Sequence, residues 1–114
     1  MATIYHNPRC SKSRQTLELI KTQGIAPEVV LYLETPLDAE IIAGLLKKLG
    51  ISPRQLLRKG ELAYKEQNLA NTSLTEKQLI EAMVAFPKLM ERPIVVVGDK
   101  ATIGRPPEQV LEIL

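Results

Sequence analysis

Two short β-prone runs near the N-terminus are separated by one amphipathic segment of helix length, and this spacing constrains the fold most strongly. Residues 3–6 form the first run, which ends at an Asn-Pro turn signal. Helical spacing of apolar residues predicts a helix over 11–23, with Ser11 as its cap. Residues 28–33 form an apolar run typical of a strand buried on both faces. Strand, helix and strand in this order predict a right-handed parallel βαβ unit.

The C-terminal part of the chain predicts a hairpin followed by a helix. Residues 93–97 carry the strongest strand pattern in the sequence, and the Gly-Asp-Lys segment at 98–100 is typical of a tight turn. Residues 101–103 are expected to return antiparallel. Two prolines then precede a final helix over 108–114. This half is therefore a ββα unit.

Between these halves the patterns are helical throughout. The first expected helix has Pro36 in its first turn and ends at Gly50, and a Thr75 cap with Gln78 three residues later predicts another. We also expect a short helix from Ser52-Pro53 to Gly60 and a weak turn over 63–69. The helix that Thr75 caps is expected to end at Pro87. We therefore expect one domain over 1–114 with a helical insertion at about 37–90.

Composition limits the function classes. The chain has 114 residues, 45% of them hydrophobic and 25% charged, which is typical of one ordered globular domain. A net charge of +2 is below the strongly basic pattern of nucleic-acid binders. Neither a signal-peptide core nor a membrane-spanning apolar run occurs, so we expect no membrane association and a cytoplasmic location. One cysteine and one histidine permit neither an internal disulfide nor a Cys/His metal cluster.

The only cysteine lies in the segment HNPRCSKSR, between the end of a predicted strand and the start of a predicted helix. Positive charge and a helix N-terminus both favour the thiolate form of Cys10, the form that acts as a nucleophile. Unpaired backbone N–H groups and guanidinium groups also bind oxyanions. We therefore predict a reactive thiol beside an anion site, rather than an inert core cysteine. The candidate anion-binding residues are Ser11, Lys12, Ser13 and Arg14.

Several other residues are candidates by position. His6 either packs at the end of the first strand or assists Cys10, and the sequence leaves both open. Arg58, Arg92 and Arg105 each have the ordinary alternative of a solvated surface charge. The Arg92-Pro93 pair is less easily explained in that way. A proline at the start of a central strand has no backbone N–H to donate to a neighbouring strand, and a cis peptide bond before it would explain why proline stands there.

Five blocks of the sequence are similar, in order, to the glutaredoxin-coupled arsenate reductase family and in particular to its chromosomal members. The blocks are HNPRCSKSR, YLETP, LLRKGELAY, ERPIVV and IGRPPEQVLEIL, which together span essentially the whole chain. The resemblance implies a thioredoxin-like α/β fold, in which βαβ and ββα halves form three layers with a helical insertion between them. This implied fold agrees with the order of strands and helices predicted above. Ser11-Lys12 stands where well-characterised members tend to have Gly-Thr.

The resemblance also implies a reaction. Cys10 would attack arsenate, glutathione would attack the resulting adduct, and glutaredoxin would resolve the mixed disulfide as arsenite is released. Arg58, Arg92 and Arg105 would hold the oxyanion and its reduced product, His6 would assist the thiol, and Pro93 would be the cis proline of the fold. No metal or tightly bound cofactor is implied, and glutathione would be a co-substrate. The single cysteine agrees with this scheme, since external thiols must then resolve the intermediate.

Two alternatives stay open at this point. The same thiol can belong to a glutathione- or glutaredoxin-linked oxidoreductase that acts on another oxyanion, a glutathione mixed disulfide or an electrophile. The other alternative is a non-catalytic protein that resembles the thiol-sensing transcriptional regulators of this fold. Those regulators tend to carry a Cys-x-x-Cys switch, whereas Ser13 occupies the second cysteine position here.

Overall fold

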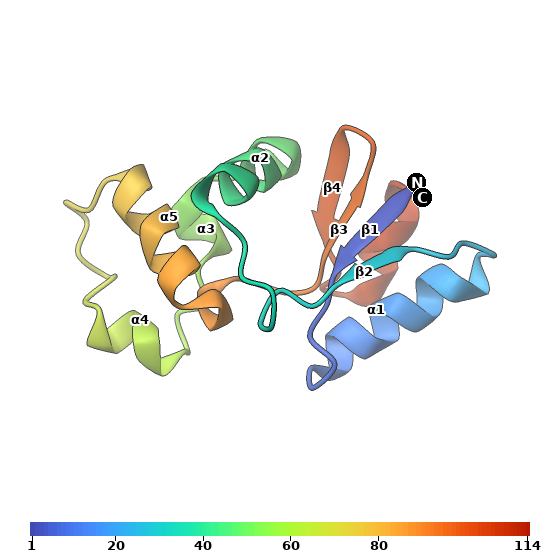
Figure 1. The fold of residues 1–114 in the computed structure, drawn as a ribbon, viewed down its shortest axis with the longest axis horizontal. Coiled ribbons are helices and arrows are strands. Elements are labelled where there is room, and N and C mark those ends of the chain that lie inside the picture. Colours follow the sequence, from blue (N-terminus) through green and yellow to red (C-terminus); the bar gives the residue numbers. More distant parts are fainter. The chain divides into compact units, whose positions relative to one another are not determined.

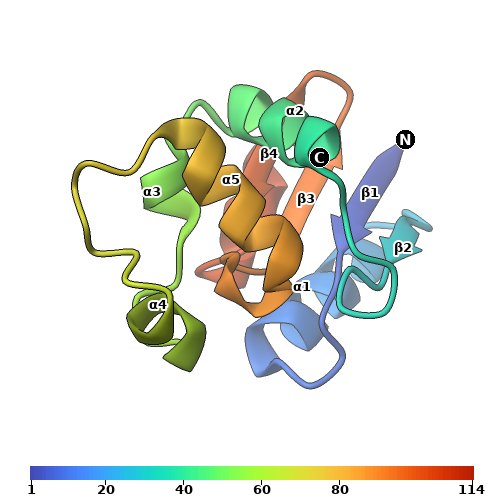
Figure 2. The same ribbon diagram turned by 60° about the vertical axis from the view of Figure 1, so that its left-hand side comes forward.

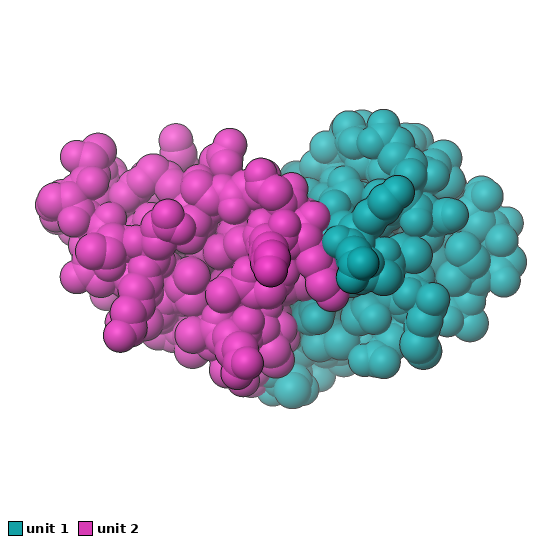
Figure 3. Space-filling view, turned by 90° about the horizontal axis from the view of Figure 1, so that it is seen from above, with its two compact units in different colours: residues 1–35, 92–114 teal, residues 36–91 magenta.

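The computed structural model describes residues 1–114 and divides the chain into two compact units. Unit 1 comprises residues 1–35 and 92–114, and unit 2 comprises residues 36–91 (Figure 3). Unit 2 corresponds closely to the insertion expected at about 37–90, while the single-domain organisation stays a prediction. The elements in chain order are β1 (Ala2–Tyr5), α1 (Ser11–Thr22), β2 (Glu28–Val30), α2 (Ala39–Leu49), α3 (Pro53–Leu56), α4 (Leu62–Glu66), α5 (Glu76–Ala85), η1 (Pro87–Leu89), β3 (Ile94–Val97), β4 (Lys100–Ile103) and η2 (Pro107–Glu112).

Unit 1 contains a four-stranded sheet with the order β2-β1-β3-β4 (Figure 1). β1 pairs parallel with β2, with Thr3 opposite Glu28, and antiparallel with β3, where Thr3 lies opposite Val96. β3 and β4 form an antiparallel hairpin in which Val96 faces Ala101. The predicted βαβ and ββα halves are therefore confirmed, and they meet where β1 and β3 pair.

The core of unit 1 joins the sheet to α1 and η2. Ile4 of β1, Val95 of β3, Ile20 of α1 and Val110 of η2 are each 0% exposed and form one cluster. α1 also packs beside η2 (Figure 1). The helical periodicity of α1 and the strand alternation of β1 both direct apolar side chains to this cluster, so burial holds α1 against the sheet.

Three expectations for unit 1 are wrong in detail. β2 is an edge strand of three residues, and Val29 is 43% exposed instead of buried on both faces. The N-cap of α1 is Cys10 rather than Ser11, which is the first helical residue. The last helix is a 3₁₀ helix over 107–112, not an α-helix over 108–114. Each difference depends on tertiary packing or backbone hydrogen bonding, to which local residue preferences are a weak guide.

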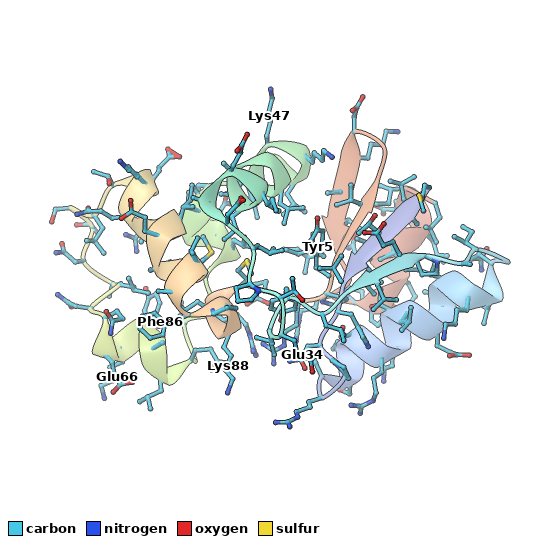
Figure 4. All side chains as sticks on the ribbon, in the orientation of Figure 1. Tyr5, Glu34, Lys47, Glu66, Phe86 and Lys88 are labelled. Atoms are coloured by element: carbon cyan, nitrogen blue, oxygen red, sulfur yellow. The ribbon has the colours of Figure 1, made fainter.

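Unit 2 is a group of helices around α5, which packs against α2, α3 and η1 (Figure 2). The expected capping box at the start of α5 is confirmed: the Thr75 side chain accepts from the Gln78 N–H and the Gln78 side chain from the Thr75 N–H. Phe86, labelled in Figure 4, is the C-cap of α5. α4 contributes no buried residue. None of the chain's helices has the length and apolar character needed to cross a membrane.

Two helix boundaries in unit 2 differ from expectation. α2 begins after Asp38, whose carboxylate accepts the Ile41 N–H at 2.8 Å, and so it does not begin with Pro36 in its first turn. A carboxylate cap satisfies an otherwise unpaired N–H, which decides the starting point. α3 ends at Leu56, well before Gly60, because Leu57 leaves the helix and forms a β-bridge with Met90.

Candidate active site

Cys10 lies where the chain turns from β1 into α1. Its N–H donates to the Asn7 carbonyl oxygen at 3.0 Å, which closes the turn, and its own carbonyl oxygen accepts the Arg14 N–H at 3.0 Å as the first bond of the helix. The side chain makes no capping hydrogen bond to the helix. Cys10 is a free thiol and 8% exposed. The sulfur is therefore not used to hold the helix start, where the partial positive charge of the helix dipole is located.

The first turn of α1 offers backbone donors next to this thiol. Ser11, Lys12 and Ser13 follow the N-cap, and N–H groups in these positions have no carbonyl partner within a helix. The first turn contains no acidic residue. Of the predicted anion-binding residues, Ser11, Lys12 and Arg14 have exposed side chains and Ser13 is buried. The segment can thus present N–H groups to an oxyanion with no competing carboxylate in its first turn.

Arg105 links Cys10 to the segment after β4. Its Nη2 lies 3.6 Å from the Cys10 sulfur, and its Nε donates to the Arg92 carbonyl oxygen at 2.8 Å. The Arg92–Pro93 peptide bond is cis, as the sequence suggested, and the Arg105–Pro106 bond is also cis. The Arg105 side chain therefore contacts two other sequence-predicted residues, Cys10 at its sulfur and Arg92 at its backbone. The Arg105 guanidinium thus places a positive charge against the sulfur.

The approach of the Arg105 segment to α1 depends on Gly104. Its N–H donates to the Pro93 carbonyl oxygen at 2.9 Å. A Cβ atom at this position would lie 2.5 Å from Thr16 Oγ1 and 2.9 Å from Pro93 Cγ, closer than packed atoms come. Thr16 is itself 0% exposed and donates its hydroxyl to the Lys12 carbonyl oxygen at 2.8 Å. Glycine thus allows the residue before Arg105 to touch the first turns of α1.

His6 contacts the site through Ser13. The His6 Nδ1 and the Ser13 Oγ are 2.6 Å apart, and Ser13 Oγ also accepts the Asn7 N–H at 3.0 Å. Because that N–H already donates to Ser13, the hydroxyl proton can be donated to Nδ1 of a neutral ring. Burial lowers the pKa of His6, with further lowering by the charges of Arg14 and Lys21. The ring therefore braces the loop that carries Cys10 rather than bonding to the thiol.

The other cations of HNPRCSKSR have different surroundings. Arg14 Nη1 donates to the Pro8 carbonyl oxygen at 2.8 Å, which holds its guanidinium beside the loop. The Arg9 side chain is exposed, and its backbone N–H donates to Asn7 Oδ1 at 3.0 Å. Lys12 is exposed, as the sequence suggested. Arg14 is thus fixed by the loop, while Arg9 and Lys12 contribute positive charge at the surface.

Arg58 belongs to unit 2. Its Nη1 lies 2.8 Å from Glu61 Oε1, and its Nε lies 3.9 Å from Glu91 Oε1. Its backbone N–H donates to the Leu89 carbonyl oxygen at 2.7 Å. Arg58 is therefore an oriented, half-buried guanidinium rather than a solvated surface charge. Its role toward Cys10 stays a prediction.

Sequence reasoning missed four residues that contact the predicted site residues or their segments. Asn7 was seen only as part of a turn signal, although its backbone and side chain both bond within the loop. Thr16 and Gly104 show no local motif and are recognised only from their contact. Glu61 lies in the LLRKGELAY block, three residues after Arg58, and this closeness in the sequence is the one signal from which their ion pair could have been predicted. No group of three or more His, Cys, Asp or Glu residues is placed to hold a metal ion.

The fold and the site together define a class of protein. A βαβ unit and a ββα unit share one sheet, and the only cysteine caps the first helix against an arginine from the segment after the last strand. This is a thioredoxin-like α/β protein whose site is built on a single thiol. The model of the ArsC family matches residues 5–113, and the chain belongs to that family.

Relatives of known sequence and structure agree with this assignment. The chain is 67% identical over 112 residues to the uncharacterized protein YfgD of Escherichia coli strain K12, covering 97% of this chain and 94% of that protein. It is 50% identical over 112 residues to an arsenate reductase of Haemophilus influenzae, covering 97% of each chain. The solved structure of an arsenate reductase from Vibrio cholerae is 53% identical, with a TM-score of 0.97 and coverage of 99% of this chain and 97% of that one.

Proposed function

We propose that this protein is an oxidoreductase that reduces arsenate to arsenite, with the Cys10 thiolate as nucleophile and with glutathione and glutaredoxin as thiol partners. Its similarity over nearly the full chain to proteins named arsenate reductase supports the reaction. The single observation that carries the proposal is the 3.6 Å contact between Arg105 Nη2 and the Cys10 sulfur. A cation at this point lies against the attacking sulfur and attracts an approaching oxyanion.

Binding comes first in this proposal. Arsenate would accept hydrogen bonds from the first-turn N–H groups of α1, beginning with Ser11, because these groups follow the cysteine directly. Arg105 lies against the sulfur and would contact an oxygen of the bound anion. By resemblance to the family, Arg92 and Arg58 would also hold the anion. Such preorganised donors stabilise negative charge that shifts during the reaction.

The chemistry then uses two thiols for one two-electron reduction. The Cys10 sulfur bonds to arsenic and one arsenate oxygen leaves as water after protonation. A glutathione thiolate next attacks, the two sulfurs become a Cys10–glutathione disulfide, and the electron pair remains on arsenic, which leaves as arsenite. Glutaredoxin then reduces the mixed disulfide by thiol exchange. Because the chain has one cysteine, both later thiols must come from outside. This cycle suits the reducing cytoplasm, which we propose as its location.

The test is a coupled assay with purified protein, glutaredoxin, glutathione and glutathione reductase, in which NADPH oxidation is followed with and without arsenate. Cys10→Ser is the blank, because an unactivated hydroxyl is far too weak an acid to supply the nucleophile. Saturable, arsenate-dependent turnover that is lost in the blank supports the proposal. Turnover retained by Cys10→Ser contradicts the mechanism.

The same assay separates the alternative substrates. If arsenate adds nothing while Cys10 still reacts rapidly with an alkylating reagent, the thiol acts on another oxyanion, mixed disulfide or electrophile. A glutathione mixed disulfide offered in place of arsenate then tests the most direct alternative. The regulator alternative predicts turnover with neither compound.

A further inference from the structure

Exposed basic side chains flank the reactive thiol of unit 1. Cys10 is only 8% exposed, whereas Arg9 before it and Lys12 and Arg14 after it have exposed side chains. A molecule that reacts with the recessed sulfur therefore approaches it across this part of the surface. These three residues, Arg9, Lys12 and Arg14, are called the basic segment below.

No carboxylate neutralises the basic segment. Residues 1–17 contain neither Asp nor Glu, and Glu18 is the first acidic residue of the chain. None of the three cations makes an ion pair. Arg14 is held by the Pro8 carbonyl oxygen, whereas the side chains of Arg9 and Lys12 make no hydrogen bond. Three unpaired cations within residues 9–14 produce a positive local potential, which attracts anions to the neighbouring thiol.

We propose that Arg9 and Lys12 select anionic, carboxylate-bearing thiols for reaction at Cys10. This inference rests on the proposed function, in which an external thiol attacks the adduct on Cys10 and remains bound as a mixed disulfide. Glutathione belongs to this class, because its carboxylates outnumber its ammonium group at neutral pH. The two side chains bind carboxylates of the incoming thiol, and the same charges disfavour a cationic thiol.

Thiol–disulfide exchange with three small disulfides tests this selectivity without arsenate or glutaredoxin. The compounds are glutathione disulfide, which is anionic, hydroxyethyl disulfide, which is neutral, and cystamine, which is cationic. The Cys10 sulfur bonds to one sulfur of the compound, the S–S bond of the compound breaks, and its other sulfur leaves as a thiol that takes up the proton lost by Cys10. Mass spectrometry of quenched samples gives each rate constant. Division by the rate constant for the neutral compound cancels any change in the reactivity of the sulfur itself.

Arg9→Glu reverses one charge of the basic segment. We expect this substitution to lower the relative rate constant for glutathione disulfide by about threefold to tenfold and to raise the one for cystamine by a similar factor. Arg9→Gln and Lys12→Gln each remove one charge, and each should lower the relative rate constant for glutathione disulfide by about twofold to threefold. High salt should weaken the preference of the parent protein for the anionic compound, because exposed charges are screened.

The matched control is Lys100→Glu, which changes the net charge of the protein by the same amount. Lys100 is exposed and pairs with Val97, which in turn lies opposite Ala2 at the start of β1. Cys10 follows the other end of β1, so Lys100 lies at the far end of the sheet (Figure 1). Both relative rate constants should stay within about twofold of the parent values in this control, because charges separated by more than a Debye length are largely screened.

The outcomes distinguish this inference from the proposed function. Relative rate constants that are unchanged in Arg9→Glu overturn the inference, and so does an equal change in Lys100→Glu, which would assign the effect to net charge. Equal slowing of all three compounds in Arg9→Glu also overturns it, because the loop and not its charge would then be altered. Circular dichroism checks the fold, and Arg9→Gln carries the test if Arg9→Glu does not fold. Expected exchange rates without any arsenate reduction would contradict the proposed reductase and leave the thiol selectivity standing.

Discussion

Among single residues, Arg105 has the most direct contact with the reactive sulfur. Its Nη2 faces Cys10 while its Nε is held by the Arg92 carbonyl oxygen, so one planar group makes both contacts. Lysine keeps the charge but cannot make both contacts from a rigid fork. We expect Arg105→Lys to lower kcat/KM for arsenate by about tenfold to a hundredfold, measured in the coupled assay. Arg9→Lys, at an exposed neighbour of Cys10, is the matched control and should change it little.

A second readout guards against an indirect effect of the Arg105 substitution. If the arginine favours the thiolate, the rate at which iodoacetamide alkylates Cys10 at neutral pH should also fall in Arg105→Lys. Circular dichroism and the melting temperature should show an intact fold. A kcat/KM within twofold of the parent value would remove Arg105 from the reaction.

His6 predicts a pH dependence of stability. Its pKa is lowered mainly by burial and further by Arg14 and Lys21, so the folded protein binds fewer protons than the unfolded chain once the pH falls below about 6.5. The free energy of unfolding should therefore be unaffected by this group above that pH and should decrease as the pH falls below it. The slope of one titrating proton is at most about 1.4 kcal/mol per pH unit.

Urea unfolding between pH 5.5 and 7.5 measures this slope, and His6 is the only histidine of the chain. His6→Gln should remove the slope while lowering stability at neutral pH, because the Ser13 contact is altered. An equal slope in His6→Gln would assign the pH dependence to other groups.

At the scale of elements, the contact between α1 and the segment after β4 depends on a glycine. The Cβ of Gly104→Ala would meet Thr16 and Pro93 at 2.5 Å and 2.9 Å. We expect a loss of about 1–3 kcal/mol in the free energy of unfolding, measured in urea, and a fall in turnover as Arg105 moves away from Cys10. Gly44→Ala is the control. Apart from its chain neighbours and the backbone of its own helix, no atom lies within 4 Å of the new Cβ, and the substitution in α2 should stabilise the fold by about 0.5–1 kcal/mol.

Local chemistry explains which elements were predicted from the sequence. The capping box at Thr75 and the left-handed Gly50 at the end of α2 are formed by neighbouring residues, so their positions follow from residue types. The edge position of β2 depends on the order of strands in the sheet, and the residue type of Val29 does not indicate that its strand lies at an edge. Likewise, Cys10 was expected at a helix start from its own segment. Its contact with Arg105 joins residues 95 positions apart and follows only from the sheet that places them together.

For the whole molecule, the single cysteine fixes how many reducing equivalents one chain can supply. Arsenate reduction needs two electrons, and a thiol that forms a disulfide contributes one of the two sulfurs involved. With arsenate but no other thiol, we expect each chain to reach at most a Cys10 adduct and to release no arsenite. Glutathione alone should allow about one arsenite per chain in the first turnover, and glutaredoxin should allow continued turnover.

Rapid separation of small molecules from protein, followed by arsenite determination at increasing enzyme concentration, measures this stoichiometry. Cys10→Ser gives the background. The mass of the protein after the glutathione-only reaction should increase by one glutathionyl group, located at Cys10. Arsenite release without added thiol would contradict the scheme, because no second sulfhydryl of the chain is available to complete the reduction. Continued turnover with glutathione alone would instead show that a second glutathione resolves the mixed disulfide, so that glutaredoxin would not be an obligatory partner.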